Sequence, residues 1–359
     1  MARIDSFLRL VVEQRASDLH FTAGAVPLIR HHGELVPLPF RALSEGEARK
    51  FLAEMLSAEE RDKLETEQEL DLLYSLPGVG RFRANLFMQS SGWGAAFRII
   101  PDRPPQLDDL GFPSSVRGLC GLANGLVLIG GPTGSGKTTT LAAIVNEINK
   151  TAKKHIVTVE DPIEFLHEPI TSAITQRQVG AHIDSFAEAL RSALRESPDV
   201  LVVGEMRDAE TLNLAVQAAE TGVLVFGTLH TSSAAKTLTR VLDMAPEENR
   251  EQLRSTLSVL LKGVIAQHLM RRNGGDGRIA AVEILLNNPA VASMIRDNKV
   301  PQIDSYLQTI SPESGMQGLE SCLLRYIRDG LIDVDEACRL SMAPEVLKKE
   351  AASLLVEST

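Results

Sequence analysis

The feature that most constrains the fold is a glycine-rich loop at residues 131–138, which matches the pattern G-x-x-x-x-G-K-[ST] at every fixed position. An apolar run at 126–129 precedes the loop and is typical of a buried strand, and apolar residues recur at helical spacing after it. Backbone N–H groups of such a loop turn toward a phosphate chain, and the helix N-terminus adds positive charge. The alternative, a glycine-rich turn that matches by chance, is disfavoured by this flanking pattern.

Nucleotide binding is therefore expected at this loop, with ATP and Mg²⁺ as ligands. Lys137 supplies a mobile cation for the outer phosphates, and the Thr138 hydroxyl is placed to ligate Mg²⁺. The predicted nucleotide-binding residues are Gly131, Pro132, Thr133, Gly134, Ser135, Gly136, Lys137, Thr138 and Thr139.

Composition excludes several other classes. Of 359 residues, 44% are hydrophobic and 23% charged, as in ordinary globular proteins, and the length suggests two or three domains. A net charge of −10 and an aromatic content of 4% argue against nucleic-acid binding. The three cysteines are widely spaced, which favours free thiols in a reducing compartment. No apolar run reaches membrane-spanning length and no signal peptide is evident, so we expect a cytoplasmic protein without direct membrane insertion.

The chain changes pattern near residue 100. Residues 1–100 combine amphipathic helices with alternating strands, which predicts a small α+β domain. Closely spaced prolines follow, and they indicate a linker at 101–115. Beyond it strands alternate with helices, so residues 116–359 are expected to form an α/β domain with a parallel sheet and further helices toward the C-terminus.

Within this second domain the apolar runs predict strands at 155–159, 200–203, 223–229 and 278–286. Helices are expected at 233–243 and 247–271.

Carboxylates follow the strand at 155–159. Glu160, Asp161 and Glu164 come directly after it, where open α/β sheets place their ligands. These side chains could orient water around Mg²⁺. A solvated turn explains the same residues equally well.

A second acid ends the strand at 200–203. This is the arrangement in which a carboxylate faces the metal or the attacking water of a nucleotide hydrolase. Gly204 stands at the usual aspartate position, so Glu205 is the expected catalytic carboxylate and a Mg²⁺ ligand together with Thr138. The alternative is an ordinary strand-end acid, which the upstream loop disfavours.

A histidine ends the next strand. His230 could sense the outer phosphate or contact a neighbouring subunit. A lone histidine is more often structural, and the pattern by itself favours that role.

Arginines gather on adjacent strands of the first domain. Arg81, Arg83 and Arg98 could reach a nucleotide from outside the phosphate-loop domain and offset transition-state charge. A solvated or ion-paired strand face is the usual alternative. Arg191, Arg195, Arg207 and Arg240 lie near the nucleotide motifs and are weaker candidates.

Four segments together resemble the secretion ATPase superfamily of type IV pili and type II secretion. Residues 131–140, 159–165, 204–208 and 227–231 are similar to its Walker A, Asp box, Walker B and His box, in the same order and spacing. Residues 16–21, 80–83, 97–101 and 290–296 are similar to segments of its pilus-retraction branch.

The resemblance implies a PAS-like N-terminal domain, a RecA-like ATPase domain with a helical C-terminal extension, and a ring-shaped homohexamer. It implies that Glu205 is catalytic with Glu164 assisting, and that His230 couples across the site. It also implies that Arg83 and Arg98 reach the nucleotide. The implied activity is ATP hydrolysis that powers pilus retraction at the cytoplasmic face of the inner membrane, through an inner-membrane platform protein and in some systems with paralogous pilus ATPases.

Other functions stay open at this point. Within the same class the chain could be an accessory retraction ATPase or a pilus assembly ATPase. A nucleotide-dependent scaffold with negligible turnover is opposed by the intact Lys137, Glu164 and Glu205. A nucleic-acid translocase is opposed by the acidic balance of the chain.

Overall fold

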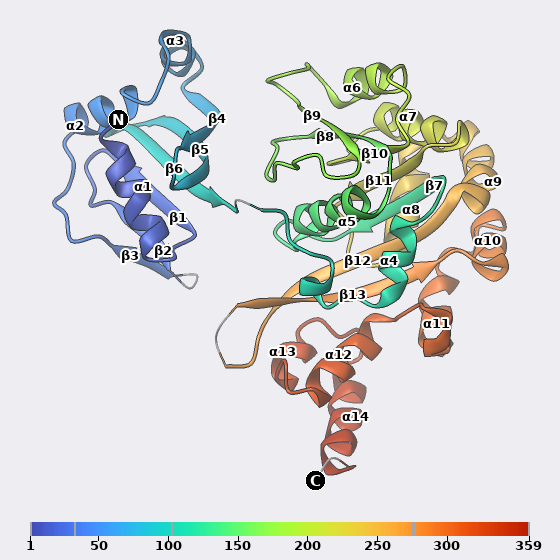
Figure 1. Cartoon of the computed structure of the whole chain (residues 1–359). Helices are drawn as coiled ribbons and strands as arrows, with labels where there is room; N and C mark the ends of the chain where they lie inside the picture. Colours follow the sequence, from blue (N-terminus) through green and yellow to red (C-terminus); the bar gives the residue numbers. More distant parts are fainter. Residues whose placement is uncertain (1, 32–33, 102, 275–276, 358–359) are drawn as a thin grey trace. The chain divides into compact units, whose positions relative to one another are not determined.

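The computed structural model describes residues 2–31, 34–101, 103–274 and 277–357. The chain separates into two compact units, Met1–Arg103 and Pro104–Thr359 (Figure 1). Asp102, in the predicted linker, lies outside the described residues. In the rest of that segment, Leu107 is buried in the core of the second unit. The linker boundaries stay a prediction.

Within its described residues, the first unit has a six-stranded antiparallel sheet, in the order β3-β2-β1-β6-β5-β4, and three helices. Fully buried Phe21, Phe82 and Phe97 lie on its inner face. Two helices begin at serines whose side chains close capping boxes, which satisfy the free N–H groups of the first turn. The strands are β1 (Asp18–Thr22), β2 (Leu28–His31), β3 (Glu34–Pro37), β4 (Glu69–Leu76), β5 (Gly80–Gln89) and β6 (Gly92–Ile100). The helices are α1 (Ile4–Glu13), α2 (Glu45–Ala53) and α3 (Ala58–Glu67).

The second unit is built on a seven-stranded sheet in the order β13-β12-β7-β11-β10-β8-β9. Neighbouring strands are parallel except β12 and β13, which pair antiparallel. The strands are β7 (Gly125–Gly130), β8 (His155–Glu160), β9 (Ala173–Gln178), β10 (Val200–Val203), β11 (Leu224–Leu229), β12 (Leu261–Arg271) and β13 (Arg278–Leu286).

Helices cover both faces of this sheet, because successive side chains of its inner strands enter different cores. Leu126 and Leu128 of β7 pack into one core, and Val127 and Ile129 into the other. The first core is closed by α6 (Phe186–Ala193), α7 (Ala209–Glu220), α8 (Ala234–Met244), α9 (Arg250–Leu260), α10 (Pro289–Arg296) and α11 (Gln302–Thr309). The second is closed by α4 (Ser114–Cys120), α5 (Lys137–Thr151), α12 (Leu319–Arg328), α13 (Val334–Cys338) and α14 (Pro344–Glu357). Short 3-10 turns lie at Asp108–Leu110, Glu247–Asn249 and Pro312–Ser314.

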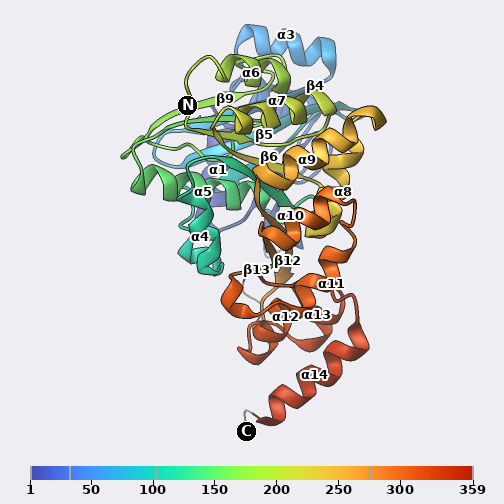
Figure 2. The same cartoon turned by 90° about the vertical axis from the view of Figure 1, so that its right-hand side faces the viewer.

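The C-terminal helices α12, α13 and α14 form a group beside β12 and β13 (Figure 2). The α/β class, the N-terminal α+β unit and the helical C-terminal extension are thus confirmed. None of the described helices is long and apolar enough to cross a membrane.

Part of the predicted helix at 247–271 is wrong. The helix ends at Leu260, and Leu261–Arg271 forms strand β12, which lies between β7 and β13. Both faces of β12 are buried, so its apolar residues do not alternate with polar ones, and such a run is not distinguishable from a buried helix by pattern. Edge strand β9 and helix α11 were not predicted; the strand sequence Ala-Ile-Thr-Gln-Arg-Gln is mostly polar.

The register of the parallel strands brings four loops to one edge of the sheet. Gly130 pairs with Leu229, Val203 with Gly227, and Val159 with Val203. The segments after β7, β8, β10 and β11 therefore leave the sheet side by side. These are the four segments in which sequence analysis placed the site, and this edge is where α/β sheets bind ligands.

Candidate active site

The glycine-rich loop has a backbone that only glycine accommodates. Gly134 and Gly136 have φ values of +77° and +90°, in the left-handed region. A Cβ atom on Gly131 would lie 2.2 Å from Ser135 Oγ and 2.8 Å from the Gln267 carbonyl oxygen. Helix α5 begins at Lys137, so its free N–H groups face the loop. This conformation is the cradle expected for a phosphate chain.

The loop contains polar groups suited to an anionic ligand. The buried Lys137 donates from Nζ to the carbonyl oxygens of Gly131 at 2.8 Å and Pro132 at 3.0 Å. Burial lowers the pKa of Lys137, and the nearby charge of Glu205 opposes that shift. The hydroxyl of Ser135 is buried without a hydrogen-bond partner among the described residues. Thr138 and Thr139 are half-buried in the first turn of α5.

Glu205 and His230 lie together next to the loop. His230 Nε2 is 3.0 Å from Glu205 Oε1, and His230 Nδ1 is 3.3 Å from Thr133 Oγ1. Arg207 donates from Nη2 to Glu205 Oε2 at 2.6 Å, and its Nη1 lies 3.9 Å from Asp161 Oδ2. One chain of contacts therefore joins all four predicted motifs.

These contacts keep Glu205 ionised. The Arg207 hydrogen bond is the largest cause of its lowered pKa; burial raises the pKa, while the charges of Arg207, His230 and Lys137 lower it. An ionised carboxylate can accept a proton from water or coordinate a cation. The predicted proximity of Glu205 and His230 to the loop is thus observed, whereas their catalytic roles stay a prediction.

The structure explains why glycine precedes Glu205. The Gly204 N–H donates to the Val159 carbonyl oxygen at 2.8 Å, so the backbone of this residue lies against β8. A Cβ on Gly204 would lie 3.0 Å from that oxygen and 3.2 Å from the Cα of Glu160. Little room remains for an aspartate, which leaves Glu205 as the carboxylate directly after strand β10.

The loop after β8 is held by side chains of β9. Gln176 donates from Nε2 to the Phe165 carbonyl oxygen at 2.9 Å and accepts from the His167 N–H at 2.8 Å. Gln178 accepts from the Ile163 N–H at 3.2 Å. The half-buried Glu164 lies in this loop, and its backbone N–H hydrogen-bonds the Glu160 carboxylate. Its assisting role is not tested by these contacts and stays a prediction.

The predicted arginines Arg81, Arg83 and Arg98 belong to the first unit. Arg83 and Arg98 are directly opposite each other on β5 and β6. Arg98 Nε lies 2.7 Å from Asp18 Oδ1, and Arg83 Nε lies 3.8 Å from Asp71 Oδ1. Arg81 has one buried guanidinium nitrogen, Nη1, without a hydrogen-bond partner among the described residues. Their roles toward a nucleotide remain predictions.

Two supporting residues were missed or underrated. Arg207 was a weaker candidate, yet it pairs with Glu205. Gln267 on β12 is buried; it accepts from Thr140 Oγ1 at 2.8 Å and donates to the Ser135 carbonyl oxygen at 2.6 Å. It thereby connects β12 to the end of the glycine-rich loop and to the start of α5. A lone glutamine inside the apolar run 264–270 was the available signal.

The residues fit a Mg²⁺ ion that is bound mainly through a nucleotide. Within the described parts of the chain, no group of three or more His, Cys, Asp or Glu side chains could hold a metal ion. Thr138 and Glu205 are the predicted protein ligands, and an oxygen-seeking ion such as Mg²⁺ commonly completes its shell with phosphate oxygens and water.

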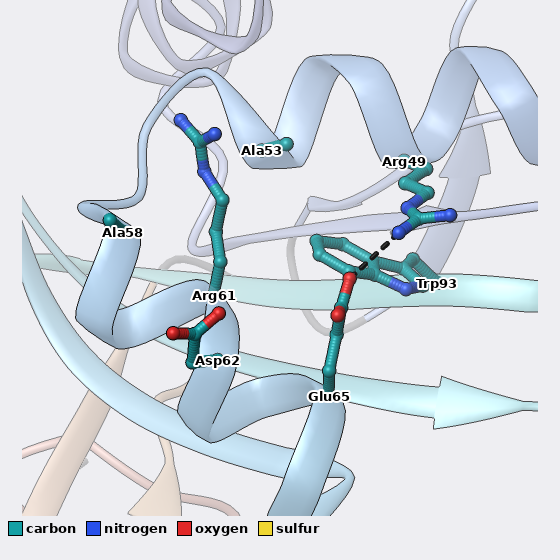
Figure 3. A pocket seen from close by; sticks show the side chains of 7 residues that line it. All are labelled: Arg49, Ala53, Ala58, Arg61, Asp62, Glu65 and Trp93. Atoms are coloured by element: carbon teal, nitrogen blue, oxygen red, sulfur yellow. Dashed lines mark hydrogen bonds and ion pairs between the residues drawn. The ribbon is translucent and has the colours of Figure 1, made fainter.

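A hollow in the first unit is separate from these motifs. It is lined by residues of α2 and α3 together with Trp93, and the ion pair of Arg49 with Glu65 lies across the indole ring (Figure 3). Arg49 stacks over Trp93 at 5.5 Å from a ring centroid. These residues form an ion-paired surface of the first unit, and none of them belongs to the four motifs.

Comparison with known proteins places the chain in a family. Residues 113–327 match the type II/IV secretion system protein family. The chain is 45% identical over 342 residues to the type IV pilus retraction ATPase PilT of Pseudomonas aeruginosa, covering 95% of this chain and 99% of that protein. It is 45% identical over 340 residues to a twitching motility protein of Neisseria gonorrhoeae, covering 95% and 91%. The type IV pilus ATPase PilU of Pseudomonas aeruginosa is 36% identical over 333 residues, covering 93% and 87%.

A solved structure agrees with this placement. The crystal structure of the pilus retraction motor PilT with bound ADP superposes with a TM-score of 0.89 at 42% identity, covering 97% of this chain and 99% of that one. The chain belongs to the family of type II/IV secretion system proteins and is an ATPase of that family. Within it, the whole-length matches place the chain with the type IV pilus retraction ATPases rather than with the more distant PilU.

Proposed function

We propose that this chain hydrolyses ATP to power the retraction of type IV pili. The observation that carries the proposal is the contact chain of Thr133, His230 and Glu205, which joins a phosphate-binding loop to an ionised carboxylate. The whole-length similarity to pilus retraction ATPases supports the cellular task.

The residues divide the chemistry among them. The loop backbone receives the phosphate chain, and Lys137 turns its ammonium from the carbonyl oxygens of Gly131 and Pro132 to the outer phosphates. Glu205 orients the attacking water and takes its proton, while the water oxygen bonds to the γ-phosphorus. The bond to the bridging oxygen breaks, giving ADP and phosphate. Mg²⁺, held by Thr138 and Glu205, neutralises charge on the phosphates when bound.

His230 would report on the outer phosphate. Its ring lies between Thr133 of the loop and Glu205, so a shift of the loop on nucleotide binding changes what the imidazole contacts. Glu164 assists from the neighbouring loop. Arg81, Arg83 and Arg98 supply positive charge from the first unit, as arginines do in many phosphoryl-transfer enzymes.

The working assembly in this proposal is a homohexameric ring at the cytoplasmic face of the inner membrane. Binding of the γ-phosphate closes each nucleotide site and its loss permits opening. The ring passes this motion to an inner-membrane platform protein, which removes pilin subunits from the fibre base. The ring is what the resemblance of the four motifs to secretion ATPases implies, and the whole-length match to a solved pilus retraction motor supports the role as a motor.

A complementation experiment tests the cellular task. In the source bacterium, deletion should abolish twitching motility while surface pili persist, because assembly continues without retraction. The wild-type chain should restore motility, and the Glu205→Gln variant, expressed at the same level, should not. Loss of surface pili on deletion would indicate an assembly motor, and unchanged motility with normal pili would contradict the proposal.

A further inference from the structure

The segment that carries His230 is short and held at its far end by two strands. Residues 230–233 connect β11 to α8. His268 on β12 lies with Nε2 2.9 Å from the Ser232 carbonyl oxygen; since a carbonyl only accepts, the imidazole donates. Glu283 on β13 accepts from the Ala234 N–H at 2.6 Å. The two contacts flank Ser233, the N-cap of α8.

Glu283 and His268 act from the same face of the sheet. Glu283 pairs with Ala266 across β12 and β13, and His268 pairs with Ala281 two positions along. Side chains at such diagonal positions point to the same side. The backbone between His230 and α8 is therefore attached on both sides of Ser233 to one rigid element.

The start of α8 has free N–H groups that a carboxylate satisfies well. The Ser233 side chain accepts from the Lys236 N–H, and Glu283 accepts from the Ala234 N–H in the same first turn. The helix dipole favours a negative group at this end. Glu283 lies 49 residues further along the chain than Ala234. Its hydrogen bond therefore fixes the position of the first turn of α8 within the unit and also satisfies a free N–H group.

We propose that Glu283 is a positioning residue for ATP hydrolysis, which with His268 fixes the start of α8 and thereby holds His230 against Glu205. The proposal rests on the proposed ATPase function. It adds a residue outside the four motifs, from a strand that none of them includes. A freed turn would let residues 230–233 shift, and the 3.0 Å contact between His230 Nε2 and Glu205 Oε1 would be lost first.

The surroundings of Glu283 make this contact sensitive to substitution. Burial raises the pKa of Glu283 to about 7; the Ala234 N–H lowers it, and the charge of Asp304 on α11 raises it. Lys236 on α8 faces Asp304 and donates to Ser232 Oγ. Removing the Glu283 carboxyl would leave the Ala234 N–H without its acceptor, which a partly buried helix start does not tolerate well.

Steady-state ATP hydrolysis by the full chain tests the proposal. Glu283→Leu should lower kcat on the order of tenfold while the KM for ATP changes less than about twofold, because the phosphate loop is untouched. Glu283→Gln should restore most of the rate, since its amide oxygen still accepts from the Ala234 N–H. Glu320→Leu is the matched control: Glu320 on α12 accepts from the Met342 N–H at 2.8 Å, within the C-terminal helices, and its loss should leave kcat unchanged.

Three results would overturn the proposal: a wild-type kcat in Glu283→Leu, a loss of kcat in Glu320→Leu equal to that in Glu283→Leu, or a kcat in Glu283→Gln as low as that in Glu283→Leu. If Glu283→Leu does not fold, His268→Phe is the test variant, because it keeps an aromatic ring but removes the donor to the Ser232 carbonyl oxygen. A lower kcat at unchanged KM in this variant supports the proposal. A wild-type kcat overturns it. No turnover in the wild type would overturn the proposed ATPase function as well, whereas the other failures leave that function standing.

Discussion

At the scale of single residues, the site depends on the charged and polar groups that contact Glu205. Its two oxygens are occupied by Arg207 and His230, and Lys137 lies close enough to affect its charge. Sequence patterns predicted Glu205 and Lys137 because each has a fixed place in a motif, whereas the functional role of His230 was predicted only by the family resemblance. They could not rank Arg207 above Arg191, Arg195 or Arg240, since only the fold shows which guanidinium meets the carboxylate.

The buried ammonium of Lys137 gives one prediction. Lys137→Ala should reduce ATP affinity by at least about tenfold and hydrolysis with it, because the outer phosphates lose their nearest cation. Titration with a fluorescent ATP analogue measures the affinity. Lys348→Ala, which removes an exposed lysine of α14 that pairs with Glu345, is the control. Unchanged affinity in Lys137→Ala would contradict the role given to this side chain.

Glu283 predicts a pH dependence of stability. Its pKa is raised from 4.5 to about 7, so between these values the folded chain holds a proton that the unfolded chain has released. Its contribution to stability is therefore lost as pH rises through that window, by on the order of 3 kcal/mol. Glu283→Gln should lose less stability between pH 5 and pH 8 than the wild type does, as measured by thermal unfolding. Equal losses in the two chains would contradict this assignment.

At the scale of elements, the strands that carry the motifs and strand β13 were predictable from the sequence, whereas the supporting strands β9 and β12 were not. Runs such as 126–129 and 200–203 are short, apolar and followed by glycine, which marks a buried parallel strand. β12 has an equally apolar run but follows a helix without a break, so pattern extended the helix through it. Gln267 was missed for the same reason, because its importance depends on β12 pairing with β7.

The turn between β7 and α5 gives a prediction at this scale. Gly131→Ala should destabilise the second unit by roughly 1–3 kcal/mol and weaken ATP binding, because the new Cβ meets the Gln267 backbone. Gly118→Ala is the matched control: in helix α4 nothing lies within 4 Å of the added Cβ. That change should stabilise by about 0.5–1 kcal/mol. Denaturant unfolding measures the stability of both variants, and ATP titration measures their affinity. Wild-type stability and affinity in Gly131→Ala would contradict the steric role given to this glycine.

At the scale of the whole molecule, the proposed function gives the arginines of the first unit a part in hydrolysis. Arg83→Ala and Arg98→Ala should each lower kcat on the order of tenfold or more. Because Arg98→Ala also removes a partner of the buried Asp18, thermal unfolding of both variants is measured beside the rate. Arg49→Ala is the control, because Arg49 pairs with Glu65 over Trp93 instead (Figure 3). Wild-type kcat values in both Arg83→Ala and Arg98→Ala would contradict a role of these arginines in hydrolysis and would indicate a structural role instead.

The most direct test of the central claim is ATP turnover by the purified wild-type chain beside Glu205→Gln. The wild type should release phosphate steadily from ATP with Mg²⁺. Glu205→Gln should bind ATP with similar affinity, while turnover falls by at least about a hundredfold, because the amide cannot take the proton from water. Turnover in the variant at the wild-type rate would contradict the assignment of Glu205, and ATP binding without turnover in the wild type would contradict the motor itself.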